Sequence, residues 1–329
     1  MDVVIAGYGR AGELHAALLS KRPDIRVTGV ADATAARRDA ATTRFPGATV
    51  TARLDELDVH ADVVVICTPP ACHEPDTRTA LTQHRAHVLC EKPAVLDANT
   101  GHRLGKIAAT TSRVLHPVHN YLHSPAINQL RQIATQSIGP ITHAAITISR
   151  PGPAHGHPDW QPTWRTAPAA GGGILYDHGP HACYLVRHLT GQPAISAQCR
   201  TQAGDNGTDH AAHLDLRFAD GATATITLSW NATSRINSYE LHGTHGSVRL
   251  RNGRLELTRP TPTLSLRTEN HATGGHTHKT WTNAVHQTFL NHISRPSHDN
   301  QPWNTAVHVA EITTAARASA AAEGRPIAC

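Results

Sequence analysis

Short apolar runs alternate with amphipathic stretches in the first third of the chain. The apolar runs occupy residues 3–6, 25–31, 63–67 and 87–90, and helical patterns at residues 11–21 and 73–83 lie between them. Continuous apolar strands separated by helices are typical of a parallel sheet that is covered on both faces. The pattern therefore predicts a doubly wound α/β domain of the Rossmann type over residues 1–119.

After Pro117 the pattern changes to an alternation of apolar and polar residues. Residues 141–150, 211–218 and 222–230 alternate with period two, as strands with one dry face do. Further strands are expected at 239–242, 247–250 and 254–258, helices at 124–133, 177–189 and 305–322, and a polar, Gly- and His-rich loop at 267–282. We predict an α+β domain with a largely antiparallel open sheet over residues 120–329, whose last helix packs back on the first domain.

Composition and charge exclude several classes of protein. A chain of 329 residues with 39% hydrophobic residues is long enough and apolar enough for two cores. The net charge of +5 is scattered, with no basic run longer than Arg37-Arg38, which argues against a nucleic-acid partner. No apolar stretch approaches the ~18 residues of a membrane helix, and no basic segment of a signal peptide precedes the first strand. The six cysteines form no CxxC pair, so we expect reduced thiols and a cytoplasmic protein.

A glycine-rich turn predicts a dinucleotide site. It follows the first strand and opens the first helix, where its glycines permit a tight turn and a close approach of the backbone to a pyrophosphate. Asp32 ends the second strand 20 residues after Gly12, where a carboxylate binds the ribose hydroxyls. The predicted contacts are Gly7, Tyr8, Gly9, Arg10, Ala11, Gly12, Asp32 and Arg37.

The carboxylate of Asp32 favours NAD over NADP, because it repels a 2′-phosphate. Arg37 and Arg38 follow one turn later and would soften that preference. We therefore predict NAD as the cofactor and keep NADP as the alternative.

Three further segments carry a family resemblance. Thr68-Pro69-Pro70 with His73 follows the strand predicted at 63–67, Glu91-Lys92-Pro93 follows the strand predicted at 87–90, and Gly171-Gly172-Gly173 precedes Asp177-His178-Gly179-Pro180-His181 in the second domain. Together with Asn120-Tyr121, Trp164-Arg165 and the turn at 243–247, this set resembles the Gfo/Idh/MocA oxidoreductases, the family of glucose–fructose oxidoreductase and inositol dehydrogenase. The similarity covers nearly the whole chain.

The resemblance implies an NAD(P)-dependent dehydrogenase or reductase that acts on a CH–OH group of a sugar, inositol or related polyol. It implies that Lys92, Asp177 and His181 line the nicotinamide and the reacting carbinol. It also places Thr68, Pro69, His73, Glu91 and Lys92 at the cofactor. A homo-oligomer, either a dimer or a tetramer, is usual in the family.

The residue types support the same catalytic set. Lys92 lies at the carboxyl edge of the predicted sheet, where the ligands of parallel sheets bind. Only four of the 30 Lys and Arg residues are lysine, and a desolvated lysine, unlike arginine, exchanges a proton near neutral pH. Asp177 and His181 are four residues apart at the start of a predicted helix, so we expect both on one face.

We expect His181 to take the hydroxyl proton as the general base and Asp177 to orient the imidazole or hold a substrate hydroxyl. Lys92 would polarise the reacting oxygen or share the proton transfer. The alternatives are a surface Lys92 packed on Pro93, an Asp177 that only caps a helix, and a half-buried structural His181.

Hydrogen-bonding groups and aromatic rings around this set suit a polyhydroxylated substrate. The candidate substrate contacts are Lys92, Asn120, Tyr121, Trp164, Arg165, Tyr176, Asp177, His178 and His181. Members of the family often carry an aspartate three residues after the histidine, where this chain has Tyr184, so the orientation of the substrate is in question there. His155/His157 and His276/His278 resemble metal-ligand pairs, but no third ligand completes either pair, and we predict no metal.

Three other functions are open. A redox-neutral enzyme of the same family would oxidise a sugar transiently, epimerise or cleave it, and reduce it again with the same bound NAD. A non-catalytic dinucleotide sensor would keep the fold without the chemistry, but Lys92, Asp177 and His181 are all present. A nucleic-acid-binding protein would show a strongly salt-dependent affinity.

Overall fold

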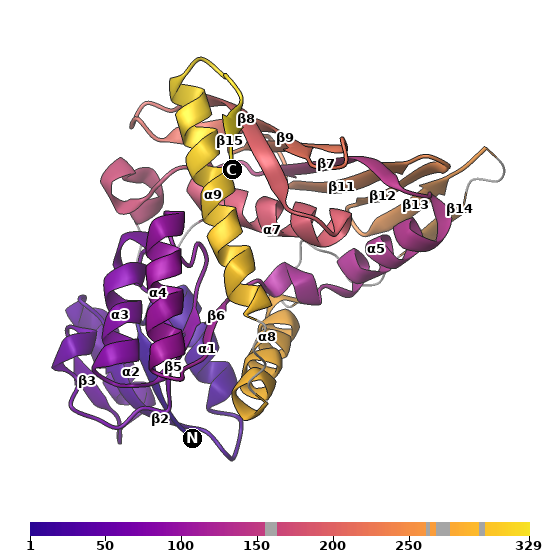
Figure 1. Cartoon of the computed structure of the whole chain (residues 1–329). Helices are drawn as coiled ribbons and strands as arrows, with labels where there is room; N and C mark the ends of the chain where they lie inside the picture. The colour runs from indigo at the N-terminus through magenta and orange to yellow at the C-terminus, as the bar shows by residue number, and fades with distance from the viewer. Residues whose placement is uncertain (155–162, 261–263, 268–276, 296–299) are drawn as a thin grey trace. The chain divides into compact units, whose positions relative to one another are not determined.

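The computed structural model describes residues 1–154, 163–260, 264–267, 277–295 and 300–329 (Figure 1). The chain divides into two compact units. The first contains Met1–Val118, His155–Trp164 and Thr282–Val307, and the second contains His119–Ala154, Arg165–Trp281 and His308–Cys329.

The first unit is a doubly wound α/β domain. Its parallel sheet has the strand order β3-β2-β1-β4-β5-β6, and the chain order reverses between β1 and β4, at the point where such folds bind ligands. Its elements are β1 (Asp2–Ala6), α1 (Arg10–Leu19), β2 (Arg26–Ala31), α2 (Ala35–Arg44), β3 (Thr49–Thr51), β4 (Val63–Ile66), α3 (His73–Thr82), β5 (His87–Cys90), α4 (Ala98–Thr110) and β6 (Leu115–Pro117), with short 3-10 turns at Leu54–Glu56 and Pro70–Cys72.

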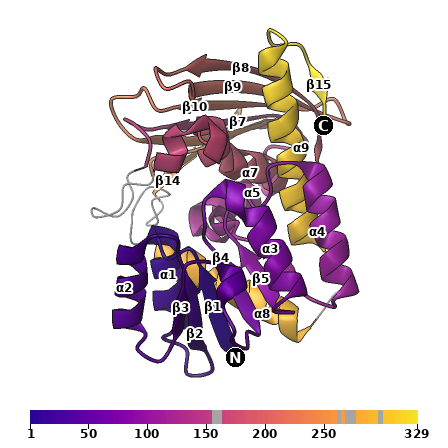
Figure 2. The same cartoon turned by 90° about the vertical axis from the view of Figure 1, so that its left-hand side faces the viewer.

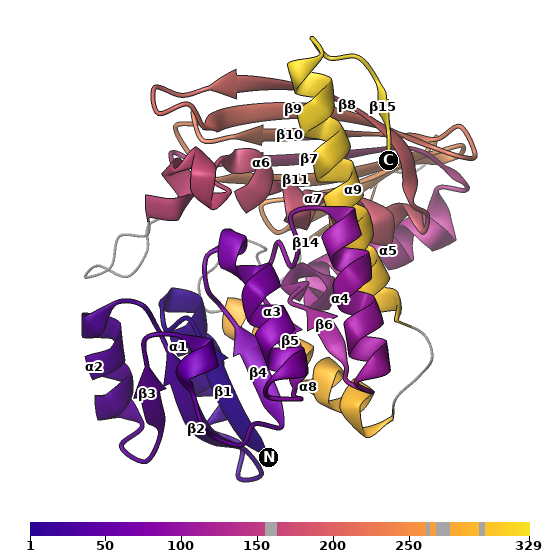
Figure 3. The ribbon, with the colours of Figure 1, turned by 60° about the vertical axis from the view of Figure 1, so that its left-hand side comes forward.

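The apolar runs of the sequence form the central strands, as predicted. All four residues of β4 are buried, because helices cover both faces of the sheet. Figure 3 shows α3 and α4 side by side in this unit, and the two helices contact each other. On the other face, Ala16 and Leu19 of α1 share one hydrophobic cluster with Val285 and Phe289 of α8 (Thr277–Ser294).

The helix α8 corrects the prediction of a loop for residues 277–282, whereas residues 268–276 of that predicted loop lie outside the described residues. Its helical residues begin at Thr277, and Trp281, Val285 and Phe289 repeat every four residues and are buried. This spacing places the three side chains on one helix face. The Gly- and His-rich residues just before the helix hid its start.

The second unit is built on a mostly antiparallel sheet with the order β14-β13-β12-β11-β7-β10-β9-β8-β15, in which only β7 and β10 of the described strands pair in parallel. Its strands are β7 (Ile141–Ser149), β8 (Ala194–Ala203), β9 (Asp209–Phe218), β10 (Thr223–Ser229), β11 (Ile236–Gly243), β12 (Gly246–Arg251), β13 (Arg254–Thr258), β14 (Leu264–Arg267) and β15 (Ile327–Ala328). Its helices are α5 (Pro125–Ser137), α6 (Ile174–Asp177) and α7 (Gly179–Thr190), with 3-10 turns at Asn120–His123, Thr163–Thr166 and Pro168–Ala170.

Alternation along the strands separates the two faces of this sheet. In β10, Ala224, Ile226 and Leu228 are buried, whereas the threonines between them are half-buried. Figures 1 and 2 show α5 and α7 against the sheet, and α7 contacts β7 and β10. Their apolar side chains form one core with the buried strand residues.

The last helix, α9 (Gln301–Ala321), takes part in both units. Its start packs on α4, where Trp303 donates a hydrogen bond from Nε1 to the carbonyl of Gly101 at 2.9 Å. From His308 onward it packs on the second sheet, and Ser319 accepts a hydrogen bond from the N–H of Cys199 at 2.9 Å. The helix predicted at residues 305–322 is therefore divided between the two units.

Candidate active site

The glycine turn after β1 is held by contacts between backbone atoms. Gly7 has φ +86°, and a Cβ there would lie 2.6 Å from the backbone of Cys67 and Thr68. A Cβ at Gly12 would lie 1.9 Å from the carbonyl oxygen of Gly7. Helix α1 begins at Arg10 with Gly9 as its N-cap. The turn thus presents a helix N-terminus at the topological switch point, where a pyrophosphate binds.

The carboxylate of Asp32 lies beside this turn and is 6% exposed. Its Oδ2 accepts a hydrogen bond from the N–H of Tyr8 at 2.8 Å, and its Oδ1 accepts one from the N–H of Thr34 at 2.8 Å. An ionised carboxylate offers about four lone-pair sites, so acceptor capacity remains for ribose hydroxyls. Asp32 therefore braces the turn and also belongs to the candidate ribose site.

Two arginines lie close to Asp32. Arg37 places its NH1 atom 3.6 Å from Oδ2 of Asp32, and the same nitrogen would lie 3.6 Å from a Cβ at Gly9. Arg38 donates instead to the backbone carbonyl of Asp32 at 2.9 Å. Of the two arginines, Arg37 is thus the one whose guanidinium lies near both the carboxylate of Asp32 and Gly9.

The segments after β4 and β5 are joined by His73, which is 1% exposed. Its Nε2 lies 2.8 Å from the carbonyl oxygen of Thr68, and its Nδ1 lies 2.7 Å from that of Pro93. Burial lowers the pKa of His73 despite these two acceptors, so the neutral ring donates to one carbonyl at a time. With both nitrogens used in this way, His73 holds the two strand ends together, and its contact with a cofactor stays a prediction.

The hydroxyl of Thr68 donates to Asp76 at 2.7 Å, which ties the segment after β4 to helix α3. Pro69 follows as the N-cap of the 3-10 turn. Both residues follow the carboxyl end of β4, and the backbone N of Thr68 lies beside Gly7.

A buried chain of three side chains supports the segment that carries Lys92. Oε1 of Glu91 lies 3.3 Å from Nε2 of His15, and Nδ1 of His15 lies 2.7 Å from Nε2 of His286. Burial lowers the pKa of His286 to about 2, so His286 is neutral and donates to His15, which in turn donates to Glu91. This chain links α1, α8 and the end of β5.

Glu91 is the anionic end of this chain. Burial raises the pKa of Glu91, but the hydrogen bond from His15 and the charge of Lys92 outweigh burial and hold the pKa below its usual range. The other carboxylate oxygen accepts a hydrogen bond from the N–H of Lys92 at 3.0 Å. The ionised Glu91 therefore fixes the backbone of the half-buried Lys92.

In the second unit, three glycines form the entry to α6. Gly173 has φ +109°, and a Cβ there would lie 2.2 Å from Oδ1 of Asp209. The other oxygen of Asp209 accepts a hydrogen bond from the N–H of Leu175 at 2.7 Å. Asp209 thus caps the short helix, and a residue larger than glycine at position 173 would displace the cap.

Asp177 is the last residue of α6 and is 2% exposed. Its Oδ2 lies 3.1 Å from Nε of Arg165 and 3.3 Å from Nδ1 of His178. Gly173 donates from its N–H to the carbonyl of Arg165 at 2.8 Å, so the glycine segment also fixes the backbone of this arginine. The structure therefore brings together Arg165, Asp177 and His178 from the predicted set.

The expectation that Asp177 and His181 lie on one helix is wrong. Helix α6 ends at Asp177, and α7 begins at Gly179. Pro180 has no N–H to donate to the carbonyl of Tyr176, so one helix cannot run through this point. The two side chains come from two helices that meet at His178.

His181 has its own partners on α7 and on the 3-10 turn after β6. Its Nδ1 lies 2.8 Å from the hydroxyl of Tyr184, and its ring lies 4.8 Å from that of Tyr121. The hydroxyl of Tyr184 accepts from the N–H of Tyr121 at 3.3 Å and lies 3.5 Å from Oδ1 of Asn120. The structure thus groups Asn120, Tyr121 and His181 around Tyr184.

Tyr176 and Trp164 are the remaining predicted substrate residues. The ring of Tyr176 is half-buried, with the guanidinium carbon of Arg317 4.9 Å from its centroid. Trp164 is half-buried and is assigned to the first unit, as is Lys92, whereas Arg165 belongs to the second. The catalytic prediction thus draws Lys92 from one unit and Asp177 and His181 from the other.

Sequence reasoning missed several residues that support these groups. His15 and His286 gave no signal, because residues 271 positions apart meet only in the fold. Likewise, no pattern in the sequence indicated that Asp209 caps helix α6. The Gly179-Pro180 pair, by contrast, was a visible sign of the helix break.

The described residues contain no group of three or more His, Cys, Asp or Glu side chains that could hold a metal ion. The side chains of the pairs His155/His157 and His276/His278 lie outside the described residues. All six thiols are unpaired. No helix in the described part of the chain is long and apolar enough to span a bilayer.

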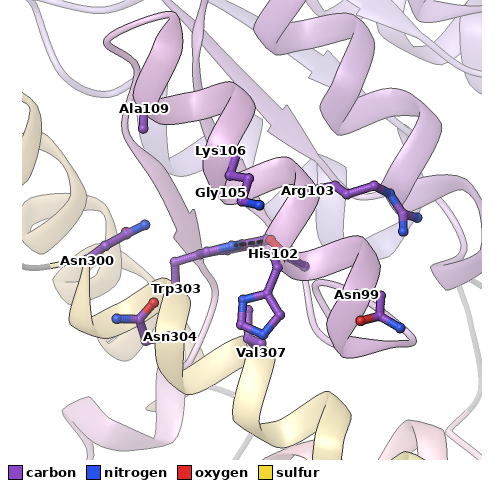
Figure 4. A pocket seen from close by; sticks show the side chains of 11 residues that line it. Asn99, His102, Arg103, Gly105, Lys106, Ala109, Asn300, Trp303, Asn304 and Val307 are labelled. Atoms are coloured by element: carbon purple, nitrogen blue, oxygen red, sulfur yellow. Dashed lines mark hydrogen bonds between the residues drawn. The ribbon is translucent and has the colours of Figure 1, made fainter.

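A groove of about 740 Å³ lies between α4 and the start of α9 (Figure 4). Gly101 and Gly105 let the helices approach, since a Cβ at Gly101 would lie 2.8 Å from Val307 and one at Gly105 would lie 3.2 Å from Trp303. Its lining contains none of the predicted site residues. We therefore interpret the groove as a result of how α4 and the start of α9 pack on each other.

Two family descriptions match the chain. Residues 1–119 match the oxidoreductase family with an NAD-binding Rossmann fold, and residues 128–249 match the GFO/IDH/MocA C-terminal domain.

Characterised relatives cover most of the chain. An inositol 2-dehydrogenase of Pseudarthrobacter chlorophenolicus is 34% identical over 252 residues, which cover 70% of this chain and 68% of that protein. A 1,5-anhydro-D-fructose reductase of Ensifer adhaerens is 29% identical over 71% of this chain and 70% of its own length. Among solved structures, GenD2 from gentamicin A biosynthesis in complex with NAD has a TM-score of 0.84 at 26% identity and covers 100% of this chain and 96% of its own. KijD10, a 3-ketoreductase from Actinomadura kijaniata solved with NADP, has a TM-score of 0.81 at 20% identity, covers 97% of each chain and shares the fold.

Proposed function

The chain belongs to the Gfo/Idh/MocA family of NAD-binding oxidoreductases, and from this premise we propose that it interconverts one carbinol of a cyclic sugar, inositol or related polyol with the ketone. The observation that carries this proposal is the setting of His181. Its Nδ1 is engaged by Tyr184 at 2.8 Å, and the preceding helix α6 ends on Asp177, whose buried carboxylate pairs with Arg165 at 3.1 Å. That arrangement offers one proton acceptor and a set of hydrogen-bonding groups for neighbouring hydroxyls.

The residues of the first unit fit a nicotinamide dinucleotide. A side chain at Gly7 or Gly12 would collide with backbone, so this turn is shaped for close approach to a pyrophosphate. When bound, NAD supplies the hydride acceptor. Asp32 would hold the ribose hydroxyls and favour NAD, while Arg37 keeps some affinity for a 2′-phosphate.

Each catalytic residue receives one role. His181 would take the hydroxyl proton in oxidation, and Lys92 would place its compact ammonium at the oxygen that becomes the carbonyl. Asp177 would hold a substrate hydroxyl together with Arg165 and His178, rather than orient His181. This role is supported by its ion pair with Arg165 and by the contact between Tyr184 and Nδ1 of His181.

The names of the relatives support the substrate class. One acts on inositol and another on 1,5-anhydro-D-fructose, a polyol and a keto-sugar. The test is a panel of inositols, aldoses and keto-sugars, assayed with NAD and NADH by the absorbance of reduced nicotinamide. Turnover with a cyclic polyol or its ketone is expected, and a panel without any turnover contradicts the proposal.

The same assay separates the redox-neutral alternative. A dehydrogenase releases one NADH for each substrate oxidised, whereas a redox-neutral enzyme converts substrate without net NADH. Product analysis beside the absorbance reading distinguishes the two.

We also propose a cytoplasmic homo-oligomer. The six unpaired thiols suit a reducing compartment. One face of the second sheet is only partly buried within the chain, with Thr225, Thr227 and Glu240 on it, and would serve as a subunit contact. Light scattering on the purified protein tests this, and a monomer at micromolar concentration would contradict it.

A further inference from the structure

Tyr184 is a fully buried side chain whose hydroxyl meets the proposed catalytic base. It lies one turn after His181 on α7, is 0% exposed, and its hydroxyl oxygen is 2.8 Å from Nδ1 of His181. The ring of His119 stacks on the tyrosine ring at 4.2 Å with an angle of 27°. Tyr184 is thus held by its own helix α7 and by the stacked ring of His119, which directly precedes the 3-10 turn Asn120–His123.

The hydroxyl has two other neighbours of different kinds. The N–H of Tyr121 can only donate to it, at 3.3 Å, and Oδ1 of Asn120 can only accept from it, at 3.5 Å. A phenol has one hydrogen and can both donate and accept. It can therefore give its hydrogen to Nδ1 of His181, or give it to Asn120 and accept a hydrogen from Nδ1.

We propose that Tyr184 is the positioning residue of His181 and that it leaves both neutral tautomers of the imidazole accessible. With Nδ1 engaged by the phenol, proton exchange with substrate passes through Nε2. When Nδ1 carries the hydrogen, Nε2 accepts the hydroxyl proton as the carbinol is oxidised to the ketone. The oxidation step leaves the imidazolium, and reduction runs it in reverse, with Nε2 returning the proton to the oxygen as the ketone is reduced to the carbinol. When the phenol donates to Nδ1, the neutral ring carries its hydrogen on Nε2 and donates a hydrogen bond to the bound ketone.

A carboxylate in this place would act differently. It can only accept, so it would fix the hydrogen on Nδ1 and stabilise the imidazolium. A nearby negative charge raises the pKa of a histidine, whereas a neutral phenol does not add such a charge. Tyr184 therefore suits an imidazole that starts oxidation as a neutral base and whose protonated form is not stabilised by a second carboxylate.

This inference rests on the proposed function, because it concerns the partner of His181. The first test is Tyr184→Phe, which keeps the ring stacked on His119 and removes only the hydroxyl. We expect kcat to fall about 10-fold in both directions, in the range found when an orienting partner is lost. KM and the affinity for NAD should stay within about threefold, and the pH of the rate limb should not move, because no charge is removed.

Tyr239→Phe is the matched control. Tyr239 lies in the same unit, is 1% exposed, and its hydroxyl has no hydrogen-bond partner in the described structure. Removal of this hydroxyl should leave kcat unchanged. If Tyr184→Phe also keeps the wild-type kcat in both directions, the inference is wrong and Tyr184 only fills the core.

The second test introduces the missing charge. Tyr184→Asp should shift the acidic limb of the oxidation rate upward by about one pH unit, because a carboxylate stabilises the imidazolium. A limb that does not move would contradict the role of Tyr184 at Nδ1.

If Tyr184→Asp does not fold, the inference can still be tested by a measurement on the wild-type protein. ¹⁵N spectra of labelled histidine, compared with those of His181→Asn to identify the His181 signals, report the tautomer directly. Averaged shifts at both ring nitrogens near pH 8 are expected, and a single fixed tautomer would overturn the inference. Wild-type turnover in His181→Asn would instead remove the proposed role of His181, so the two failures are distinguishable.

Discussion

The two glycine-rich segments of this chain use glycine for different physical reasons. At Gly7 and Gly12 an added Cβ would meet backbone atoms, at 2.6 Å and 1.9 Å. At Gly173 it would meet the carboxylate of Asp209, at 2.2 Å. Backbone cannot move aside without shifting a strand or a helix, whereas a carboxylate can rotate at the cost of the cap that it forms.

The difference separates a rigid binding frame from an adjustable arrangement of side chains. The first segment positions backbone N–H groups and a helix end, which bind phosphates whatever the substrate is. The second positions Asp177 through its ion pair with Arg165, and Nδ1 of His178 lies 3.3 Å from the same carboxylate. We therefore expect changes in the first segment to alter the affinity for NAD and changes in the second to alter turnover and substrate choice.

Lys92 is the exception to this division, because it lies in the first unit but has a proposed catalytic role. Lys92→Arg keeps the charge but removes proton exchange and brings a wider, planar group to the reacting oxygen. We expect kcat to fall at least ~100-fold, the usual scale for a positioned acid–base group, while NAD affinity changes little. Steady-state kinetics and NAD titration measure the two quantities.

Lys106→Arg is the control for this prediction, since Lys106 is exposed on α4 and lies outside the candidate site. Near-normal turnover in Lys92→Arg would show that Lys92 contributes only its positive charge. The first unit would then bind the cofactor without supplying a catalytic residue.

His181 tests the other side of the comparison. As a base, it is active when neutral, so the oxidation rate should fall as the pH drops through the imidazole pKa, ~6.5 before local shifts. His181→Asn should lower kcat by about 100-fold and abolish that limb, with NAD affinity unchanged. A pH profile that keeps the limb in the variant would assign the base to another group, with Lys92 the first to examine.

Gly12→Ala probes the rigid frame itself. The new methyl group would lie 1.9 Å from the carbonyl oxygen of Gly7, so α1 must move away from the turn. Overpacking of this kind costs ~1–3 kcal/mol, and we expect the Kd for NAD to rise about 30-fold. Gly47→Ala is the control, because a Cβ there has no neighbour within 4 Å. A folded Gly12→Ala protein with wild-type NAD affinity would show that the turn is not the phosphate site.

The frame could be predicted from the sequence because it depends on local backbone geometry. Gly7, Gly9 and Gly12 follow an apolar strand at a fixed spacing, and Asp32 closes the next strand. Both the fold class and the start of α1 follow from that pattern. The period-two alternation similarly predicted β10 and its neighbours.

The side-chain network could not be predicted in the same way. The contact between His15 and His286 joins residues far apart in sequence, and no local pattern announces it. Tyr184 was visible as a departure from the family, but only the structure places its hydroxyl at Nδ1 of His181. The break between Asp177 and His181 was predictable from Pro180, and the four-residue spacing of Trp281, Val285 and Phe289 was a sign of α8.

We expect the smallest effect at Asp32, whose side chain contacts the backbone of the glycine turn. Its carboxylate accepts from two backbone N–H groups and lies 3.6 Å from Arg37. Asp32→Asn keeps an acceptor oxygen for one of the two backbone N–H groups and loses the other bond. It also removes the negative charge, so a 2′-phosphate is no longer repelled and Arg37 is released to pair with it. We expect the ratio of kcat/KM for NADP to that for NAD to rise about 10-fold, with little change in kcat. Asp39→Asn, an exposed residue of α2, should leave the ratio unchanged. If the wild-type enzyme already binds NADP at least as tightly as NAD, Asp32 does not set the preference, and its role is confined to bracing the N–H groups of Tyr8 and Thr34.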